Sequence, residues 1–249
     1  MPSVRILGCR VDAVGRVEAV ERIADLANAG DAQLVVTLGV EMVMAARRDA
    51  AFAAAIDDAA LVTCDTIGLL LVSRLRGGPL RQRVTGVDLV GALARRSAVE
   101  RDVRLFLLGG AGDTALRAAA VLERAYPGAQ IAGTHDGYFD EAHSRDVTAA
   151  VRASGANVLL AGLGSPKQEL WLVRHLRETG CGVGVGIGGS LDVYAGNVQR
   201  APALARRAGL EWAYRLAKEP RRWRRQLALP QFAAAALVET LVARKAGKK

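Results

Sequence analysis

Short apolar runs alternate along the chain with longer stretches in which apolar residues recur every three or four positions. Each run is rich in Val, Ile and Leu and is followed by a Gly or Asp turn and an alanine-rich segment. This alternation is typical of a largely parallel sheet covered by helices on both faces. We therefore predict a Rossmann-like α/β fold with strands in VRILGC (4–9), LVVTL (34–38), ALVTC (60–64), RLFLLGG (104–110), AQIAGT (129–134), NVLLAGLG (157–164) and GVGVGIGG (182–189).

The alternation ends near residue 200. From there helical periodicity continues without a further strand, and Pro220 and Pro230 are expected to cut it into pieces. A chain of 249 residues that is 51% hydrophobic can form one large domain, or one domain with an appendage. We predict an α/β body at 1–199 and a helical appendage at 200–249.

Charge separates the same two segments. Residues 1–199 hold 21 Lys/Arg against 22 Asp/Glu, whereas residues 200–249 hold 13 against 3. A nearly neutral body argues against a protein that coats nucleic acid. The basic excess, densest in KEPRRWRRQL (218–227), favours an anionic membrane surface or diphosphate. The alternatives are a solvated helical face and a contact within a homo-oligomer.

The spacing of the cysteines and the length of the apolar segments indicate the cellular compartment of the protein. Cys9, Cys64 and Cys181 are far apart and form no CxxC pattern, so we expect neither a disulfide framework nor a zinc site. The N-terminal residues show no apolar leader with a cleavage site, and no segment reaches about 18 charge-free apolar residues. We expect a cytoplasmic protein that does not span a membrane.

Metal-binding residues are sparse. His135, His143 and His175 have no supporting neighbours in the sequence, and we expect each to be an ordinary surface histidine. The chain also lacks a DxD-like acidic pair, so we predict no catalytic metal.

Two polar residues end neighbouring strands. Asp65 follows LVTC and precedes an apolar helix, where it can be the N-cap or a carboxylate that takes a proton from a hydroxyl. Thr37 ends LVVT in the same way, with a helix-entry hydroxyl as its alternative role. Because ligands gather at the carboxyl ends of such strands, both positions are candidates for a site.

Glycines follow another strand, in LLGGAGDTALRAAA (107–120). A strand, Gly109 and Gly110, and then a helix can present backbone N–H groups to a phosphate. The segment lacks both GxGxxG and GK[ST], so a plain turn is an equal alternative.

The segment GLGSPKQELW (162–171) brings polar groups into a first helical turn. Its candidates are Gly164, Lys167, Gln168 and Glu169. A lysine in a first turn opposes the helix dipole unless an anion lies there. We therefore favour a ligand-binding role over a solvated loop.

Taken in order, these segments resemble the WecG/TagA/CpsF family of bacterial glycosyltransferases over nearly the whole chain. The blocks that carry the resemblance are TLGVEMVMAARRD, CDTIG, RVTGVDL, FLLGGAGD, GLGSPKQELW and GGSLDVYAGNVQRAPALARRAGLEWAYRLAKEPRRWRR. The resemblance implies sugar transfer from a UDP-sugar to a polyprenyl-diphosphate-linked sugar at the inner face of the plasma membrane, with inversion and with neither metal nor cofactor.

The resemblance also implies roles for single residues. Asp65 matches the proposed base, Thr37 stands beside it, and Arg83 and Gln168 match other site positions. Residues implied to contact the acceptor are Arg200, Arg207, Arg215 and Arg222.

Two residues depart from the family pattern. Gly39 stands where an asparagine is common, and Thr66 stands where a glycine is common. The first change removes an amide donor and acceptor, and the second would be strained if the turn needs a positive φ. A non-catalytic paralogue that binds a sugar nucleotide or a membrane is therefore an alternative. A dinucleotide-dependent oxidoreductase is disfavoured because no GxGxxG follows the first strand.

Overall fold

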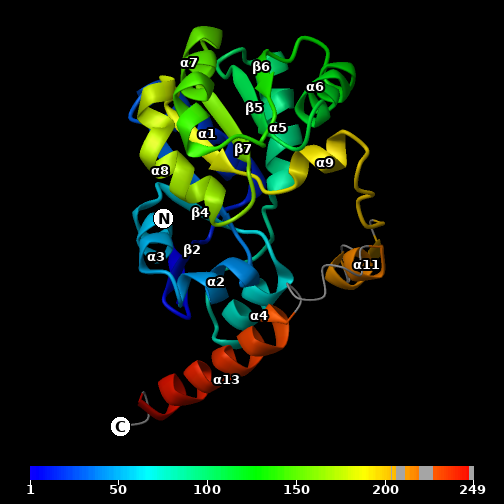
Figure 1. Ribbon diagram of the computed structural model, residues 1–249. Helices are drawn as coiled ribbons and strands as arrows, with labels where there is room; N and C mark the ends of the chain where they lie inside the picture. Colours follow the sequence, from blue (N-terminus) through cyan, green and yellow to red (C-terminus); the bar gives the residue numbers. More distant parts are fainter. Residues whose placement is uncertain (203, 206–210, 219–226, 247–249) are drawn as a thin grey trace.

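The computed structural model describes residues 1–202, 204–205, 211–218 and 227–246 (Figure 1). Its centre is a parallel six-stranded sheet with the order β4-β3-β8-β7-β5-β6. The predicted α/β fold is therefore confirmed, and six of the seven predicted runs lie in this sheet. Its strands are β3 (Gln33–Leu38), β4 (Leu61–Cys64), β5 (Leu105–Gly109), β6 (Ile131–His135), β7 (Val158–Gly162) and β8 (Val183–Gly186).

Helices cover both faces of the sheet, so alternate residues of a strand enter different cores. In β7, Val158 and Leu160 pack on one face, and Leu159 and Ala161 on the other. The first face is covered by α1 (Arg16–Ala29), α5 (Gly86–Val99), α6 (Thr114–Ala125) and α9 (Ser190–Tyr194). The second is covered by α2 (Val40–Ala46), α3 (Ala50–Asp58), α4 (Ile67–Leu75), α7 (Ser144–Ser154), which the short η1 (Glu141–His143) precedes, and α8 (Lys167–Thr179).

The first predicted strand is wrong as a member of the central sheet. Residues 4–9 belong instead to an antiparallel hairpin of β1 (Ser3–Ile6) and β2 (Cys9–Asp12). Leu7 and Gly8 both have positive φ, at 49° and 89°, so the chain reverses at once and pairs with itself. A parallel partner would have required a long crossover.

After residue 200 the described segments are helical, as predicted: α11 (Glu211–Lys218) and α13 (Ala228–Ala246). Pro230 does not break the chain into a further piece, because it lies in the first turn of α13, where no backbone N–H is needed. Among the described residues, no helix is both long and apolar enough to cross a bilayer.

Helix α13 packs against α2 and α4 at one end of the molecule (Figure 1). Its Phe232 is buried, and a Cβ on Gly68 of α4 would lie 3.5 Å from the Phe232 ring. Arg76 follows α4 and donates to Glu239 Oε2 at 2.7 Å and Thr240 Oγ1 at 2.8 Å. Part of the basic appendage is thus integrated with the body, and the boundary at residue 200 stays a prediction.

Candidate active site at the carboxyl edge of the sheet

Thr37 lies buried near the end of β3, beside the central strand β8. Its Oγ1 donates to the carbonyl oxygen of Gly186 at 2.7 Å. The hydroxyl thus ties the ends of two neighbouring strands together, rather than starting the next helix, whose N-cap is Gly39.

Asp65 follows β4 directly and is half-buried. Its backbone N–H donates to Leu38 O at 3.0 Å, which keeps it at the edge beside the end of β3. The N-cap of α4 is Thr66, so Asp65 is not the N-cap that its position also allowed.

Arg83 comes from a distant segment to the same place. The next residue, Val84, donates its N–H to Cys64 O at 2.8 Å and accepts from Thr63 Oγ1 at 3.0 Å. Because Arg83 precedes Val84 and Asp65 follows Cys64, the two charged residues flank one backbone hydrogen bond. The structure thus brings Thr37, Asp65 and Arg83 to one end of the sheet.

The two departures from the family pattern face each other. A Cβ built on Gly39 would lie 3.3 Å from Thr66 Cγ2, so the methyl group of Thr66 fills the space beside Gly39. Thr66 has φ −112° and Gly39 has φ −109°, so both backbones are extended. The turn does not need a positive φ at Thr66, and the backbone strain expected there is absent. Thr66 Oγ1 is buried and has no hydrogen-bond partner among the described residues.

Gln168 and Glu169 are both buried in the first turn of α8. Gln168 Nε2 donates to Glu169 Oε1 at 2.6 Å, and Gln168 Oε1 accepts from Gly188 N–H at 3.1 Å. This pair therefore lies beneath the loop that follows β8, one strand away from Thr37.

Lys167 points away from this pair. The side chain is exposed, and its Nζ donates to Phe139 O at 3.3 Å. The same Nζ lies 5.1 Å from the centroid of the Phe139 ring. The expected anion at the α8 N-terminus is thus not needed to hold this lysine, because a carbonyl and an aromatic face already do so.

Backbone packing accounts for the glycines after β5. Gly109 has φ 145°, and a Cβ there would lie 2.5 Å from Gly162 O at the end of β7. Gly110 has φ 74° and is packed against Thr114. Gly164 has φ 78° with open space around it. The turn role of Gly109 and Gly110 is therefore clear, and it leaves their backbone at the same edge as Thr37 and Asp65.

Arg200 forms an ion pair with Asp88, a residue that was not predicted as part of the site. Its Nη2 donates to Asp88 Oδ1 at 2.5 Å, and Thr85 Oγ1 donates to Asp88 Oδ2 at 2.8 Å. Burial alone would raise the pKa of Asp88, but the hydrogen bonds from Arg200 and Thr85 outweigh it and lower the pKa. The T-x-x-D spacing in TGVD, typical of a helix start, was the available signal. Arg207 and Arg222 lie outside the described residues, as does the Arg215 side chain.

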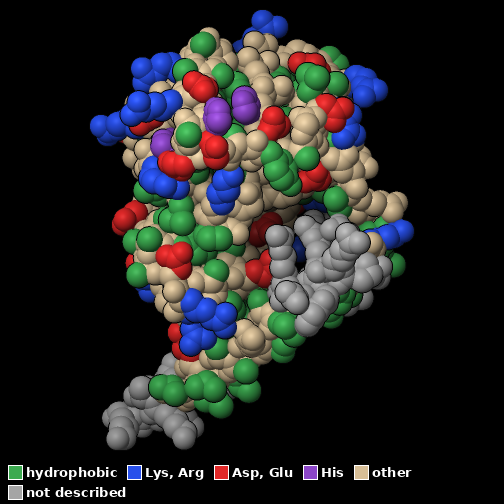
Figure 2. Space-filling view, in the orientation of Figure 1, with side chains coloured by type: hydrophobic (Ala, Val, Ile, Leu, Met, Phe, Trp, Pro, Cys, Tyr) green, Lys and Arg blue, Asp and Glu red, His purple; other side chains and the backbone are tan. Residues whose placement is uncertain are grey.

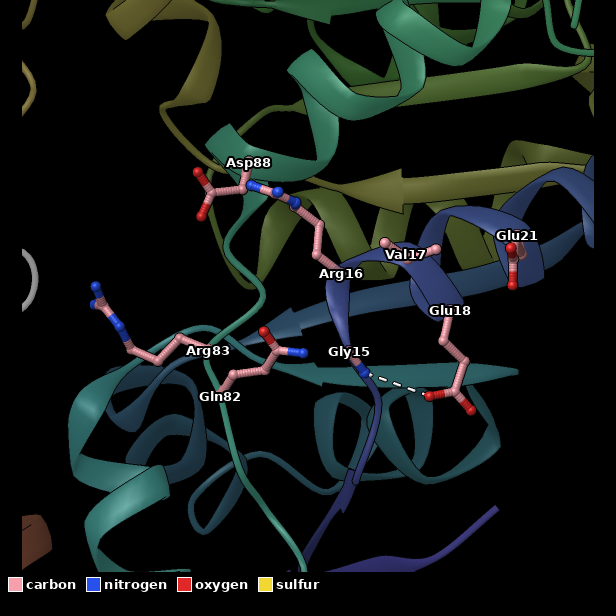
Figure 3. Close-up of a pocket in the computed structure, with 8 residues that line it drawn as sticks. All are labelled: Gly15, Arg16, Val17, Glu18, Glu21, Gln82, Arg83 and Asp88. Carbon is pink, nitrogen blue, oxygen red and sulfur yellow. Dashed lines mark hydrogen bonds between the residues drawn. The ribbon is translucent and has the colours of Figure 1, made fainter.

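A cleft of about 470 Å³ opens between the start of α1 and the segment before α5 (Figure 3). Arg16 extends toward Asp88 across it, while Arg83 points to the other side of the segment. No sequence motif singles out Arg16 or Gln82. The lining residues are Gly15, Arg16, Val17, Glu18, Glu21, Gln82, Arg83 and Asp88.

The prediction of three ordinary surface histidines is wrong for His175. Its side chain is 14% exposed, its Nε2 lies 2.8 Å from Glu141 Oε1, and its ring packs on Trp171. Histidine side chains gather on the face over α7 and α8 because the fold brings distant segments together there (Figure 2). Within the described residues, no group of three His, Cys, Asp or Glu is placed to hold a metal ion.

The cysteines are free and buried. Burial raises the pKa of the Cys64 thiol to about 12 and that of Cys9 to about 11. Cys64, which precedes Asp65, therefore stays a thiol at neutral pH.

The chain is similar to known proteins over most of its length. Residues 4–246 match the model of the Glycosyl transferase WecG/TagA/CpsF family. An N-acetylglucosaminyldiphosphoundecaprenol N-acetyl-beta-D-mannosaminyltransferase from Bacillus spizizenii is 36% identical over 203 residues, covering 82% of this chain and 78% of the relative. A protein of the same name from Bacillus subtilis (strain 168) is 32% identical over 206 residues, covering 83% and 79%.

Proposed function

The chain belongs to the WecG/TagA/CpsF family of glycosyltransferases, and from this premise we propose that it moves a sugar from a UDP-sugar to a polyprenyl-diphosphate-linked sugar. The acceptor class follows the relatives, whose names specify N-acetylglucosaminyldiphosphoundecaprenol. The proposed reaction proceeds with inversion and without a metal, in the assembly of a cell-surface polysaccharide or cell-wall polymer. Family membership also removes the oxidoreductase alternative.

One observation carries the proposal: Thr37, Asp65 and Arg83 come from three segments to the carboxyl end of β3 and β4, with Gln168 one strand further. Inverting transfer needs a base for the attacking hydroxyl and stabilisation of the departing diphosphate. In the proposed mechanism, the Asp65 carboxylate takes the proton from the acceptor hydroxyl while the hydroxyl oxygen attacks the anomeric carbon of the donor sugar. The bond from that carbon to the UDP oxygen breaks in the same displacement, and UDP leaves.

Positive and backbone groups at the same edge are suited to the leaving diphosphate. In the proposal Arg83 stabilises its charge, Gly109, Gly110 and Gly164 offer backbone contacts, and Lys167 adds a second positive side chain. The acceptor diphosphate is assigned to Arg200, Arg207, Arg215 and Arg222. Because Asp88 holds Arg200 at 2.5 Å, this arginine has a fixed position beside the cleft.

We further propose that the appendage holds the enzyme on the anionic inner face of the plasma membrane. Its excess of positive charge supports this, since each basic residue near an anionic leaflet contributes about 1 kcal/mol. The structure adds apolar side chains exposed along α13 (Figure 2), namely Leu237, Val238, Leu241 and Val242.

The test is to measure UDP release from a panel of UDP-N-acetylhexosamines and UDP-hexoses with a short-chain polyprenyl-diphosphate GlcNAc. Acceptor-dependent release with one donor, and a product of inverted configuration, support the proposal. If every donor fails although UDP binds, the chain is the non-catalytic paralogue. Activity that survives a chelator supports metal independence, and activity restored only by a divalent cation contradicts it.

A matched liposome experiment tests the location. Arg221, Arg222, Arg224 and Arg225 are replaced together by glutamine, with Arg95, Arg101, Arg124 and Arg145 on the body as the control set. We expect the first variant alone to lose sedimentation with anionic liposomes, and wild-type binding to fall as salt rises. Equal binding of all three proteins would contradict the role of these four arginines, and a wild type that does not bind anionic liposomes at low salt would contradict the membrane location.

A further inference from the structure

The buried pair at the start of α8 has a role that burial alone does not explain. Gln168 and Glu169 are 2% and 0% exposed, so neither side chain reaches solvent. Polar side chains this deep are normally held by specific partners. Here the Gln168 carboxamide is a bridge, with its nitrogen on Glu169 Oε1 and its oxygen on Gly188 N–H.

The bridge is fitted to the end of the central strand. A Cβ on Gly186 would lie 2.8 Å from both Gln168 Nε2 and Glu169 Oε1, so the pair occupies the space of the missing side chain. The carbonyl of the same glycine accepts from Thr37 Oγ1 at 2.7 Å. Glu169 is therefore connected, through one amide and one glycine, to the residues that end β3 and β8.

Glu169 fixes which way the carboxamide faces. The two ends of an amide have nearly the same shape, and only hydrogen bonding decides which end is oxygen. Glu169 Oε1 accepts from Nε2, so the amide oxygen must face the Gly188 N–H. If residue 169 offered no acceptor, the flipped amide would cost less, and the Gly188 N–H could lose its partner.

Charge supports the same role. Burial raises the pKa of the Glu169 carboxyl, which favours the uncharged acid. An uncharged acid still offers its carbonyl oxygen to Gln168, whereas a buried carboxylate would repel a diphosphate bound at this edge.

We propose that Glu169 is a positioning residue for sugar transfer: it fixes the Gln168 carboxamide, and through that amide the loop that follows β8. This inference rests on the proposed function, and it replaces a direct contact between Glu169 and the substrate with an action through Gln168. The loop that follows β8 then has a fixed geometry at the site.

Two substitutions separate positioning from structure. Glu169→Gln keeps an uncharged acceptor, and we expect kcat within about threefold of wild type. Glu169→Met keeps the volume without an acceptor, and we expect kcat to fall about 10- to 100-fold at similar KM. The thermal midpoint of Glu169→Met should be unchanged or higher, because a buried carboxyl becomes an apolar group. Glu123→Met, at an exposed site on α6, is the control.

A readout independent of activity is amide hydrogen exchange at Gly188. We expect exchange there to be at least about tenfold faster in Glu169→Met than in wild type or Glu169→Gln, with Val185 unchanged. A wild-type protein that transfers no sugar would contradict the proposed function, while Gly188 exchange would still test the bridge. Unchanged Gly188 exchange, or equal losses of kcat and thermal stability in Glu169→Met, would overturn the role of Glu169.

Discussion

The carboxyl edge of the sheet has two halves that are built differently. In the glycine half, formed by Gly109, Gly110 and Gly162, the backbone of Gly109 packs against that of Gly162, and a Cβ on Gly109 would lie 2.5 Å from Gly162 O. The polar half, Thr37, Asp65, Arg83 and Gln168, is made of side chains. Backbone N–H groups can hold an anion but cannot exchange protons with it, whereas a carboxylate can. We infer that the glycine half serves binding and the polar half serves the chemical step.

The strongest test of this division is Asp65→Asn. We expect turnover to fall ~10²- to 10⁴-fold with little change in UDP affinity, because the lost function is proton transfer. Steady-state kinetics and UDP titration measure the two effects. Asp113→Asn, an exposed carboxylate at the helix start in the glycine half, is the control and should change turnover no more than a few-fold. Near-normal turnover of Asp65→Asn would contradict the assignment.

The glycine half is tested by stability. Gly109→Ala meets a backbone carbonyl and a disfavoured φ, so we expect it to cost more than about 3 kcal/mol of unfolding free energy. Gly155→Ala shares only the positive φ of 70°, with open space around it, and should cost about 1 kcal/mol. Denaturant unfolding compares them. Equal losses would show that close packing at Gly109 has no effect of its own.

A double-mutant cycle tests the contact between Gly39 and Thr66. Gly39→Asn should lower turnover while Thr66 fills the neighbouring space, and adding Thr66→Gly should recover it by about 5- to 30-fold. The reason is the distance of 3.3 Å between a Cβ at residue 39 and Thr66 Cγ2. Turnover on the polyprenyl-diphosphate acceptor is the measurement. Additive effects of the two changes would mean that the residues do not share one space.

The smallest expected effect is the pH dependence due to Glu169. In the unfolded chain this carboxyl ionises near its ordinary pKa of 4.5, and burial raises the pKa in the folded protein. Its contribution to stability is thus full below pH 4.5 and is lost as pH rises through the folded pKa. Glu169→Gln should remove that loss, so its free energy of unfolding should gain on wild type as pH increases from 4 to 8. Parallel curves would contradict a raised pKa.

Part of the polar half could be predicted from the sequence. Thr37 and Asp65 each follow a run of apolar residues, and parallel strands bring their carboxyl ends to one edge. Asp88 could not be selected in the same way, because its partner Arg200 is 112 residues away and a T-x-x-D helix start is common. The burial of Gln168 and Glu169 could not be predicted from the sequence either, because polar residues in a first helical turn are usually exposed.

The sequence by itself determined the strands of the central sheet and the segregation of positive charge, because both depend on which residue types follow one another. Strands buried on both faces read as continuous apolar runs whatever their neighbours are. The tertiary structure alone decided that Phe232 packs near Gly68. It also decided that Gly39 and Thr66 share one space. These outcomes depend on distances between segments far apart in the chain, which local patterns do not encode.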